Sequence, residues 1–301
     1  MPEETLRPED LEGSRLGGVS LAVLGFPVNH SISPALHNAA LAEMARSDSR
    51  FSEWRYRRLE VEADRLPEVL PKLRDAGFRG LNLTIPHKVQ ALELATEVDP
   101  EARAIGAVNT LLARENGWSG FNTDGYGLEQ ALREELEVEL AGAVVILLGA
   151  GGAARAAASQ SLLRGCRELW VGNRSRERLD ALLASLPSNP DEPPVQGFLL
   201  SEVPTDLPTH GAVVVNATSL GLRPNDPAPI DLSAFPPETK VLDMIYNPPE
   251  TTLLREARAR GIHAANGLAM LVHQAARSLS IWSGSEVPAA AMFSAAHQAL
   301  P

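Results

Sequence analysis

Short runs of apolar residues alternate along this chain with longer segments in which apolar positions recur every three or four residues. The short runs are bounded by glycine or polar turns, as strands are, and cover residues 20–25, 80–85, 143–149, 168–172, 212–216 and 240–244. The longer segments between them have the period of helices. This alternation predicts an α/β fold, in which helices pack on a largely parallel sheet.

Residues 107–121 depart from this alternation. Two apolar runs there flank Asn116-Gly117, a dipeptide typical of tight hairpin turns, so local antiparallel structure is expected. An acidic, helix-forming stretch follows over residues 126–140 and leads to the second set of strands. We therefore place a domain boundary near residue 125.

A glycine-rich turn joins the strand predicted at residues 143–149 to an alanine-rich helix. Gly149 and Gly151 allow a tight turn and a close approach to a pyrophosphate, and the helix start offers N–H groups to that anion. The alternative is a tight strand-to-helix crossing that binds nothing. Because strand, turn and helix agree, we favour a dinucleotide site at this turn, formed by Gly149, Ala150, Gly151, Gly152 and Ala153.

The end of the next strand indicates which dinucleotide this site prefers. An NAD site usually has Asp or Glu about 20 residues after the glycines, on the ribose hydroxyls. This chain has Asn173, Arg174 and Ser175 there, and Arg178 follows. Guanidinium groups suit bidentate contact with phosphate, so NADP is favoured over NAD. The alternative is a solvated basic surface at the start of a helix.

Two serines after the first predicted strand are candidates for binding a carboxylate. Ser31 and Ser33 stand one residue apart, and paired hydroxyls can hold a carboxylate without adding a charge. Ser33 can equally cap a helix in which Pro34 is the first residue.

Further polar side chains follow the strand predicted at residues 80–85. Asn82 and Thr84 lie two apart and so share one side of that strand, and Lys88 comes just beyond it. Asn109 and Asp124 complete a set of hydroxyls, amides, one lysine and one aspartate that suits a polyhydroxylated carboxylate. Each has a simpler explanation, since an isolated lysine is usually solvated and Asp124 can cap a helix.

Small polar loops follow two later strands. Thr218 and Ser219 come after residues 212–216, and Tyr246 comes after residues 240–244. An open α/β sheet binds its ligand at this carboxyl edge of its strands. Taken alone, these residues fit turns and helix caps equally well.

Composition and charge restrict the possible functions. The 301 residues, 44% of them hydrophobic, suffice for one large or two ordinary domains. The formal net charge of −11 argues against nucleic acid and anionic membrane surfaces as partners. The single cysteine excludes an intrachain disulfide and fits a cytoplasmic location, and the seven histidines lack metal-ligand spacing, so no metal is expected. No segment reaches the roughly 18 apolar residues of a membrane span.

Nine short motifs, taken in order, closely resemble those of shikimate dehydrogenase. They are HSISP, NLTIPHK, GAVNT, GFNTDG, GAGGAAR, NRS, NATSLG, DMIYNP and NGLAMLVHQAA. The resemblance implies a substrate domain of residues 1–125, to which residues 268–301 return, and a Rossmann-type NADP-binding domain of residues 126–267. It implies reversible, NADPH-dependent reduction of 3-dehydroshikimate to shikimate, a step of aromatic amino-acid (chorismate) biosynthesis.

The same resemblance assigns roles to the candidate residues. Ser31 and Ser33 would hold the substrate carboxylate, and the rest of the substrate site would comprise Asn82, Thr84, Lys88, Asn109, Asp124, Tyr246 and Gln274. Beyond the glycine-rich turn, the cofactor site would comprise Asn173, Arg174, Ser175, Arg178, Thr218, Ser219, Met244, Gly267 and Met270. Lys88 would stabilise the charge that forms on the substrate oxygen and donate a proton, with Asp124 orienting it.

Three alternatives remain at this point. A quinate/shikimate dehydrogenase preferring NAD is disfavoured by Arg174 and Arg178. A folate-linked or amino-acid dehydrogenase would not call for the HSISP and NTDG motifs. A noncatalytic NADP-binding regulator would normally have lost reactive residues such as Lys88 and Asp124. Both a monomer and a homodimer are compatible with the sequence.

Overall fold

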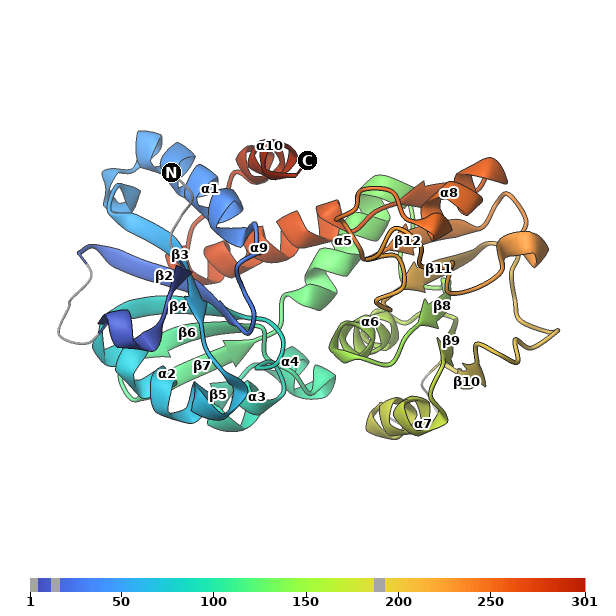
Figure 1. The fold of residues 1–301 in the computed structure, drawn as a ribbon, viewed down its shortest axis with the longest axis horizontal. Helices are drawn as coiled ribbons and strands as arrows, with labels where there is room; N and C mark the ends of the chain where they lie inside the picture. Colours follow the sequence, from blue (N-terminus) through green and yellow to red (C-terminus); the bar gives the residue numbers. More distant parts are fainter. Residues whose placement is uncertain (1–4, 12–16, 187–192, 301) are drawn as a thin grey trace. The chain divides into compact units, whose positions relative to one another are not determined.

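The computed structural model describes residues 5–11, 17–186 and 193–300 of the chain. The chain divides into two compact units, Met1–Thr123 with Val272–Pro301, and Asp124–Leu271 (Figure 1). Each unit has its own β-sheet with helices packed on it. The predicted α/β class is therefore confirmed.

The first unit contains a seven-stranded mixed sheet in the order β1-β3-β2-β4-β6-β7-β5. Its strands are β1 (Thr5–Leu6), β2 (Val19–Gly25), β3 (Trp54–Glu60), β4 (Phe78–Leu83), β5 (Glu97–Val98), β6 (Thr110–Arg114) and β7 (Gly117–Phe121). Strands β1, β3, β2 and β4 pair in parallel, whereas β6 is antiparallel to both β4 and β7. The carboxyl ends of β2 and β4 therefore lie side by side, and the loops after them carry the predicted substrate residues.

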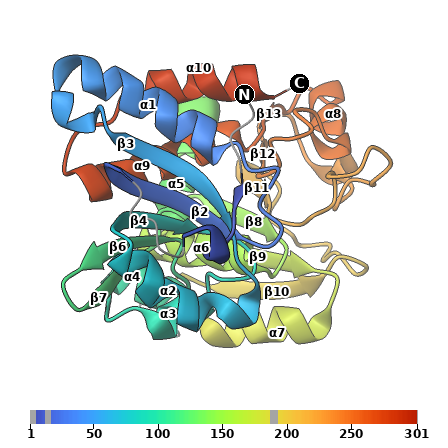
Figure 2. The same cartoon turned by 60° about the vertical axis from the view of Figure 1, so that its left-hand side comes forward.

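Helices cover both faces of this sheet (Figure 2). One face carries α1 (Ser33–Ser47), α10 (Ala289–Ala299) and the part of α9 (Leu268–Ser283) that belongs to this unit. The other carries α2 (Leu66–Asp75), α3 (Gln90–Leu94) and α4 (Pro100–Ile105). On that second face Leu66, Val69 and Leu73 pack in one buried cluster with Leu24 and Leu81, because apolar residues recur at helical spacing along α2.

Trp282 makes the carboxyl-terminal segment part of the core of the first unit. Its side chain is fully buried, and its indole N–H donates to the carbonyl oxygen of Leu111 at 2.9 Å. The ring occupies the space that a side chain at Gly80 would need. Removing a buried aromatic of this size typically costs about 3–5 kcal/mol. The return of the chain to this unit is therefore a requirement of its packing.

The hairpin expected around Asn116-Gly117 is formed by β6 and β7, but its turn lies one residue earlier than predicted. Arg114 pairs with Gly117, which leaves Glu115 and Asn116 as the loop residues. Gly117 has φ +148°, and the side chain of Thr96 fills the space where its Cβ would lie. Glycine is needed here for a packing contact that the local sequence does not reveal.

The second unit contains a six-stranded, wholly parallel sheet in the order β10-β9-β8-β11-β12-β13. Its strands are β8 (Val144–Leu148), β9 (Glu168–Asn173), β10 (Val195–Leu199), β11 (Ala212–Asn216), β12 (Lys240–Asp243) and β13 (His263–Ala265). This is the doubly wound Rossmann order. The chain reverses direction across the sheet between β8 and β11, where such sheets bind dinucleotides.

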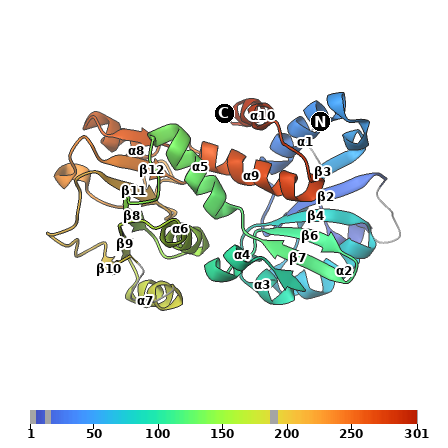
Figure 3. The same ribbon diagram turned by 180° about the vertical axis from the view of Figure 1, so that it is seen from behind.

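Helices packed with this sheet are α5 (Asp124–Leu136), α6 (Gly152–Leu163), α7 (Arg176–Ser185) and α8 (Thr252–Ala259) (Figure 3). Leu253 and Leu254 of α8 join Ile146 and Val214 of the sheet in a buried cluster. The predicted acidic helix is α5, which starts at Asp124, two residues earlier than predicted. It ends at Leu136 rather than at residue 140, because Glu137 adopts a left-handed φ of +55°. Within the described part of the chain, no helix has the length and apolar character to span a membrane.

Candidate active site

The predicted site residues divide between the two units. Those in the first unit are Ser31, Ser33, Asn82, Thr84, Lys88, Asn109 and Gln274. Asp124 is the first residue of the second unit, which also holds Tyr246 and every predicted cofactor residue.

The Ser31–Ser33 loop follows β2 and is held by main-chain and side-chain bonds. Ser31 N–H donates to Val28 O at 3.0 Å, and Arg58 Nε donates to Ser31 O at 2.8 Å. The two serine hydroxyls are 3.1 Å apart, and the hydroxyl of Ser31 also accepts from the N–H of Ser33. Ile32 occupies the cap position of α1 without a side-chain cap bond, so the alternative in which Ser33 caps the helix is wrong. The hydroxyl pair thus has a fixed separation suited to the two oxygens of a carboxylate.

Tyr56 on β3 connects this loop to β4. Its hydroxyl donates to Asn82 Oδ1 at 2.7 Å. Burial raises the pKa of Tyr56, and a hydrogen bond with Ser33 opposes that rise. The ring stacks on His37 of α1 with centroids 4.0 Å apart, and burial lowers the pKa of His37 to about 3, so the imidazole is neutral at physiological pH. The tyrosine is therefore locked between the serine loop and Asn82.

A buried polar cluster fixes the side-chain amide of Asn109. Its Oδ1 accepts from Thr123 N–H at 2.8 Å and from the hydroxyl of Thr110 at 2.9 Å, and its Nδ2 donates to the hydroxyl of Thr123 at 3.0 Å. Asn82 Nδ2 lies 3.0 Å from both Thr110 Oγ1 and Ser278 Oγ. A main-chain N–H can only donate, so the amide oxygen of Asn109 must face Thr123.

Lys88 lies in the loop after β4, beside Asn109. Val108 N–H donates to Lys88 O at 2.8 Å, which fixes the main chain of Lys88 next to that asparagine. The lysine side chain is half-buried. His87 is fully buried with Nε2 2.8 Å from Val61 O, and burial lowers its pKa. His87 therefore has the structural role of anchoring the loop.

Thr84 and Gln274 border the same region of the first unit. The methyl group of Thr84 packs against Gly25, where a Cβ would lie only 2.5 Å away. Gln274 is on α9, and its carbonyl oxygen accepts from the hydroxyl of Ser278 at 3.0 Å.

Asp124 opens α5 and is almost completely buried. The next residue, Gly125, packs against the side-chain amide of Gln160 on α6, which leaves no space for a Cβ. Further along α5, the carboxylate of Glu129 accepts from Gln160 Nε2 at 2.9 Å and from Arg164 Nε at 2.7 Å. These contacts fix α5 on α6 and so fix the direction in which Asp124 emerges.

The turn from β8 into α6 fits a pyrophosphate. Gly149 has φ +115°, and a Cβ there would lie 2.9 Å from the carbonyl oxygen of Ala217. Gly151 and Gly152 are exposed at the helix start, and a Cβ on either would meet no other atom within 4 Å. No side chain caps this helix of 12 residues. Its first N–H groups can therefore receive an anion.

The end of β9 supplies positive charge beside this turn. Arg174 and Arg178 are both exposed there. Asn173 Nδ2 donates to Ser175 O at 2.9 Å, and the hydroxyl of Ser175 accepts from Arg178 N–H at 3.4 Å. These bonds fix the main chain from which the two guanidinium groups extend. The arrangement fits the additional phosphate of NADP.

A buried carboxylate joins the loops after β11 and β12. Asn216 Oδ1 accepts from the N–H and hydroxyl of Thr218, and Asn216 Nδ2 donates to Asp243 at 2.9 Å. The hydroxyl of Thr251 donates to the other oxygen of Asp243 at 2.6 Å. Burial raises the pKa of Asp243, and these hydrogen bonds oppose the rise. The predicted cofactor residue Thr218 thus belongs to a rigid junction.

The remaining predicted residues lie near the same strand ends. Gly267 packs against the main chain of Met244, so that no side chain fits at position 267. Ser219 is exposed, whereas Met270 and Tyr246 are half-buried. Burial raises the pKa of Tyr246.

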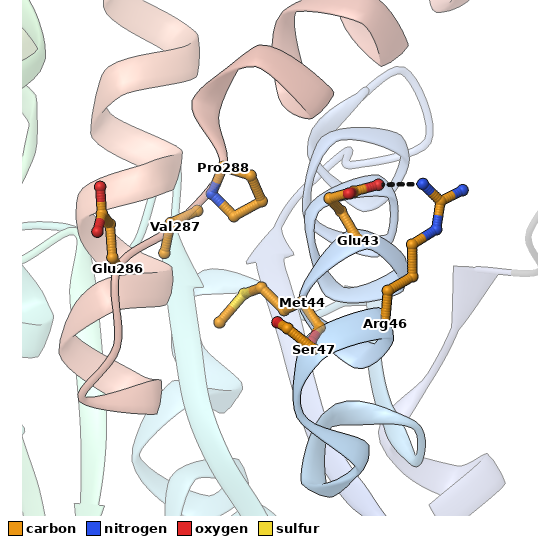
Figure 4. Close-up of a pocket in the computed structure, with 7 residues that line it drawn as sticks. All are labelled: Glu43, Met44, Arg46, Ser47, Glu286, Val287 and Pro288. Atoms are coloured by element: carbon orange, nitrogen blue, oxygen red, sulfur yellow. Dashed lines mark hydrogen bonds and ion pairs between the residues drawn. The ribbon is translucent and has the colours of Figure 1, made fainter.

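A cavity of about 390 Å³ in the first unit is separate from these residues (Figure 4). Its lining consists of Glu43, Met44, Arg46, Ser47, Glu286, Val287 and Pro288. Glu43 and Arg46 form an ion pair at 2.7 Å. None of the predicted site residues lines this cavity.

Among residues 5–11, 17–186 and 193–300, no three His, Cys, Asp or Glu side chains are grouped as a metal site requires.

Four residues that hold the predicted site residues in place were not identified from the sequence. They are Thr110, Thr123 and Ser278 of the buried polar cluster, and Tyr56, which is bonded to Asn82. Thr110 directly follows Asn109, and Thr123 precedes Asp124, so their position inside two motifs was an available signal. Ser278 lies one helical turn after Gln274. For Tyr56 the sequence offers only an aromatic residue between charged ones.

Comparison with known proteins identifies similar chains over nearly the whole length. The family model described as "Shikimate dehydrogenase substrate binding domain" matches residues 23–111, and "Shikimate 5'-dehydrogenase C-terminal domain" matches residues 267–296. Shikimate dehydrogenase (NADP(+)) of Symbiobacterium thermophilum is 40% identical over 292 residues, which cover 95% of this chain and 96% of that protein.

Two solved structures have the same fold. Shikimate 5-dehydrogenase from Thermus thermophilus, in complex with NADP(H) and shikimate, has a TM-score of 0.80 and 37% identity, covering 94% of this chain and 100% of that one. The ligand-free 5-ketofructose reductase of a Gluconobacter species has a TM-score of 0.82 and 31% identity, covering 93% and 98%.

Proposed function

Because the chain belongs to the shikimate dehydrogenase family, we propose that its first unit binds 3-dehydroshikimate and that the carboxyl edge of its second sheet binds NADPH. The chain is an NADP-dependent oxidoreductase that interconverts 3-dehydroshikimate and shikimate in the biosynthesis of chorismate and the aromatic amino acids. The observation that carries this conclusion is the 40% identity to a shikimate dehydrogenase over 95% of this chain. We assign the substrate role to residues 1–125 with 268–301, and the cofactor role to residues 126–267, with Tyr246 and Met270 as the exceptions that face the other ligand.

In this proposal the substrate is held at both ends. The hydroxyls of Ser31 and Ser33 bind its carboxylate, which is supported by their fixed separation of 3.1 Å. The ring hydroxyls are bound by Asn82, Thr84, Lys88, Asn109, Asp124, Tyr246 and Gln274. Rigid donors and acceptors orient the reacting carbonyl without ordering costs at the moment of reaction.

Lys88 is proposed as the proton donor in reduction. NADPH supplies the hydride when bound, and negative charge then forms on the carbonyl oxygen of the substrate. A lysine ammonium stabilises that charge and transfers a proton to the oxygen, which yields the hydroxyl of shikimate. In the reverse direction the neutral amine accepts the proton. Asp124 is proposed to orient the ammonium, supported by the firm anchoring of α5 on α6.

The cofactor residues are proposed to act through position and charge. Gly149, Ala150, Gly151, Gly152 and Ala153 receive the pyrophosphate, and Asn173, Arg174, Ser175 and Arg178 bind the 2′-phosphate. Thr218, Ser219, Met244, Gly267 and Met270 line the rest of the cofactor. No step requires a metal.

Replacement of Lys88 by alanine tests the catalytic assignment. Turnover of shikimate with NADP+ should fall about 10³-fold, in the range of general acid–base catalysis, while the dissociation constant for shikimate changes much less. Lys72→Ala, which removes an exposed lysine of α2, is the matched control. Absorbance of NADPH is the readout. Turnover of Lys88→Ala equal to that of Lys72→Ala would exclude the lysine as proton donor.

A second candidate substrate follows from the similarity to 5-ketofructose reductase. A ketosugar has no carboxylate and would leave the paired hydroxyls of Ser31 and Ser33 without their charged partner. We therefore expect 3-dehydroshikimate to be reduced at a kcat/KM at least about 100-fold above that for 5-ketofructose, an energy of about 2.7 kcal/mol that charged hydrogen bonds supply. Parallel assays with quinate and with NAD+ separate the remaining alternatives.

The proposal includes the setting in which the enzyme works. We place it in the cytoplasm, with its substrate and cofactor as the only partners, and with neither nucleic acid nor membrane bound. The net charge of −11 and the single cysteine support this setting. A monomer and a homodimer both satisfy the proposal.

A further inference from the structure

We propose that the hydroxyl of Ser278, buried beneath the substrate site on α9, is a positioning group for Asn109. It holds Thr110 and Thr123, and these two residues hold the side-chain amide of Asn109. The inference rests on the proposed function, in which Asn109 binds a ring hydroxyl of the substrate.

Ser278 lies at the centre of the buried cluster. Its Oγ is 2.8 Å from Thr110 Oγ1, 3.1 Å from Thr123 Oγ1, 3.0 Å from Asn82 Nδ2 and 3.0 Å from Gln274 O. Ser278 and Thr110 are fully buried, and Thr123 and Asn82 are nearly so. A serine hydroxyl offers one hydrogen and two lone pairs, so it can bond three of these four neighbours at once. Its lone pairs accept from Asn82 and Thr123, and its hydrogen goes either to Gln274 O or to Thr110 Oγ1, because Thr110 gives its own hydrogen to Asn109.

Both ends of the Asn109 amide are bound by the two threonines that Ser278 contacts. The hydroxyl of Thr110 donates to Oδ1, and the hydroxyl of Thr123 accepts from Nδ2. A change in either threonine rotamer therefore changes the direction of the amide. In a buried site such polar networks are stiff only while every member is satisfied.

The same hydroxyl ties together parts of the chain that are far apart in sequence. Thr110 is on β6, Thr123 ends the segment before α5, and Ser278 comes 168 residues after Thr110. Gln274 lies four residues before Ser278, on the same face of α9. The side chain of Ser278 thus sets the distance between Asn109 and the helical turn of α9 that carries Gln274. Asn109 and Gln274 are both proposed to contact the ring of the substrate.

Removal of the hydroxyl should leave Asn82 and the two threonines short of one partner in a dry site. They then compete for the remaining partners, and the Asn109 amide spends less time in the productive direction. Misplacement of a substrate-binding group lowers the rate without abolishing the fold.

The test is Ser278→Ala in the full-length enzyme. We expect kcat/KM for shikimate to fall about tenfold, an energy of roughly 1.4 kcal/mol, with KM for NADP+ within about a factor of two of wild type. Ser161→Ala is the matched control, because Ser161 is equally buried in a helix and donates to Ala157 O at 2.7 Å, the same backbone bond that Ser278 makes to Gln274. The control should retain wild-type kinetics.

A double-mutant cycle with Asn109→Ala shows whether Ser278 acts through Asn109. In that background Ser278→Ala should change both kcat/KM and the dissociation constant of shikimate by less than about twofold, because the group it positions is gone. Thr110→Val, which removes the hydroxyl between Ser278 and Asn109, should reproduce the roughly tenfold loss and serves as the second variant should Ser278→Ala not fold.

Two results would overturn the inference in an active enzyme. One is a loss in Ser278→Ala no greater than in Ser161→Ala, and the other is a loss that adds fully to that of Asn109→Ala. Failure of the wild-type protein to oxidise shikimate would instead overturn the proposed function. The two failures are therefore distinguishable.

Discussion

Arg58 supports the proposed substrate site without being one of the residues assigned to contact the substrate. Its Nε donates to the carbonyl oxygen of Ser31 at 2.8 Å, which fixes the main chain of the loop that carries Ser31 and Ser33. Tyr56, two residues earlier and on the same face of β3, is bonded to both Ser33 and Asn82. Strand β3 therefore supports both serines of the proposed carboxylate site, and the guanidinium group of Arg58 adds positive charge beside them.

Replacement of Arg58 by glutamine should weaken binding of the substrate specifically. We expect KM for shikimate to rise about tenfold, with kcat and KM for NADP+ little changed, because a charge-assisted hydrogen bond to the loop is lost. Arg57→Gln is the control, since the neighbouring side chain points to the other face of β3 and contacts Ser20 at 3.5 Å. Equal effects in the two variants, in steady-state kinetics, would contradict this role.

At the scale of elements, Asp243 links the ends of two adjacent strands and the start of a helix. It is the last residue of β12, accepts from Asn216 at the end of β11, and accepts from Thr251, the cap residue of α8. Its pKa is raised by burial despite these bonds. The folded protein thus binds a proton at Asp243 more readily than the unfolded chain does.

The pH dependence of stability should report this raised pKa. A carboxyl group whose pKa is raised by folding stabilises the folded protein through its bound proton. This stabilisation is fully present below the unfolded pKa of about 3.9, and it is lost as pH rises through the folded pKa. The difference in unfolding free energy between wild type and Asp243→Asn should therefore decrease over that window and then stay constant. Urea titrations at a series of pH values measure it. A difference that increases with pH would contradict the assignment.

Asp231 in the same unit provides a comparison of opposite sign. It is exposed and accepts from the hydroxyl and the N–H of Ser233, each at 2.8 Å, and the hydroxyl bond is the main cause of its lowered pKa. A lowered pKa gives stability that is present above the unfolded pKa and lost as pH falls through the folded pKa. The unfolding free energy of wild type minus that of Asp231→Asn should thus increase with pH.

The strands that sequence periodicity identified are those with continuous apolar runs. All six predicted runs are strands, because strands buried on both faces of a sheet are apolar throughout. Strand β3 was missed, since Arg55, Arg57, Arg58 and Glu60 interrupt any apolar pattern. Its charged side chains are tolerated because several of them reach solvent or bond to neighbouring loops. A local pattern does not contain that information.

The candidate site was predictable where chain order alone determines position. The glycine turn and the arginines after β9 lie at adjacent strand ends, as the order of strands and helices requires. The contact between Ser278 and Thr110 was not predictable, since Ser278 meets Thr110 only after the chain has passed through the whole second unit. The hairpin turn lies one residue earlier than the Asn116-Gly117 dipeptide suggests, and Gly117 instead provides space for the side chain of Thr96, a contact that a local dipeptide pattern does not contain.

At the scale of the whole molecule, the two units differ in how the chain builds them. The first needs two separate segments, because Trp282 from the second of them fills the core over Gly80. The unit of residues 124–271 is continuous and has its own sheet and buried cluster. A continuous unit with its own core has what independent folding requires.

Residues 124–271 expressed alone should therefore fold and bind NADP+ without catalysing any reaction. The fragment keeps the glycine turn and both arginines, so we expect a dissociation constant within about threefold of that of the intact enzyme, measured by calorimetry, since a preformed binding surface changes little. Arg174→Ala in the fragment should weaken the binding of NADP+ far more than that of NAD+.

Residues 1–123 alone should not fold, because they lack the indole of Trp282 that covers Gly80. A folded 1–123 fragment would show that the return of the chain is dispensable, whereas an unfolded 124–271 fragment would show that this unit depends on the other for its stability.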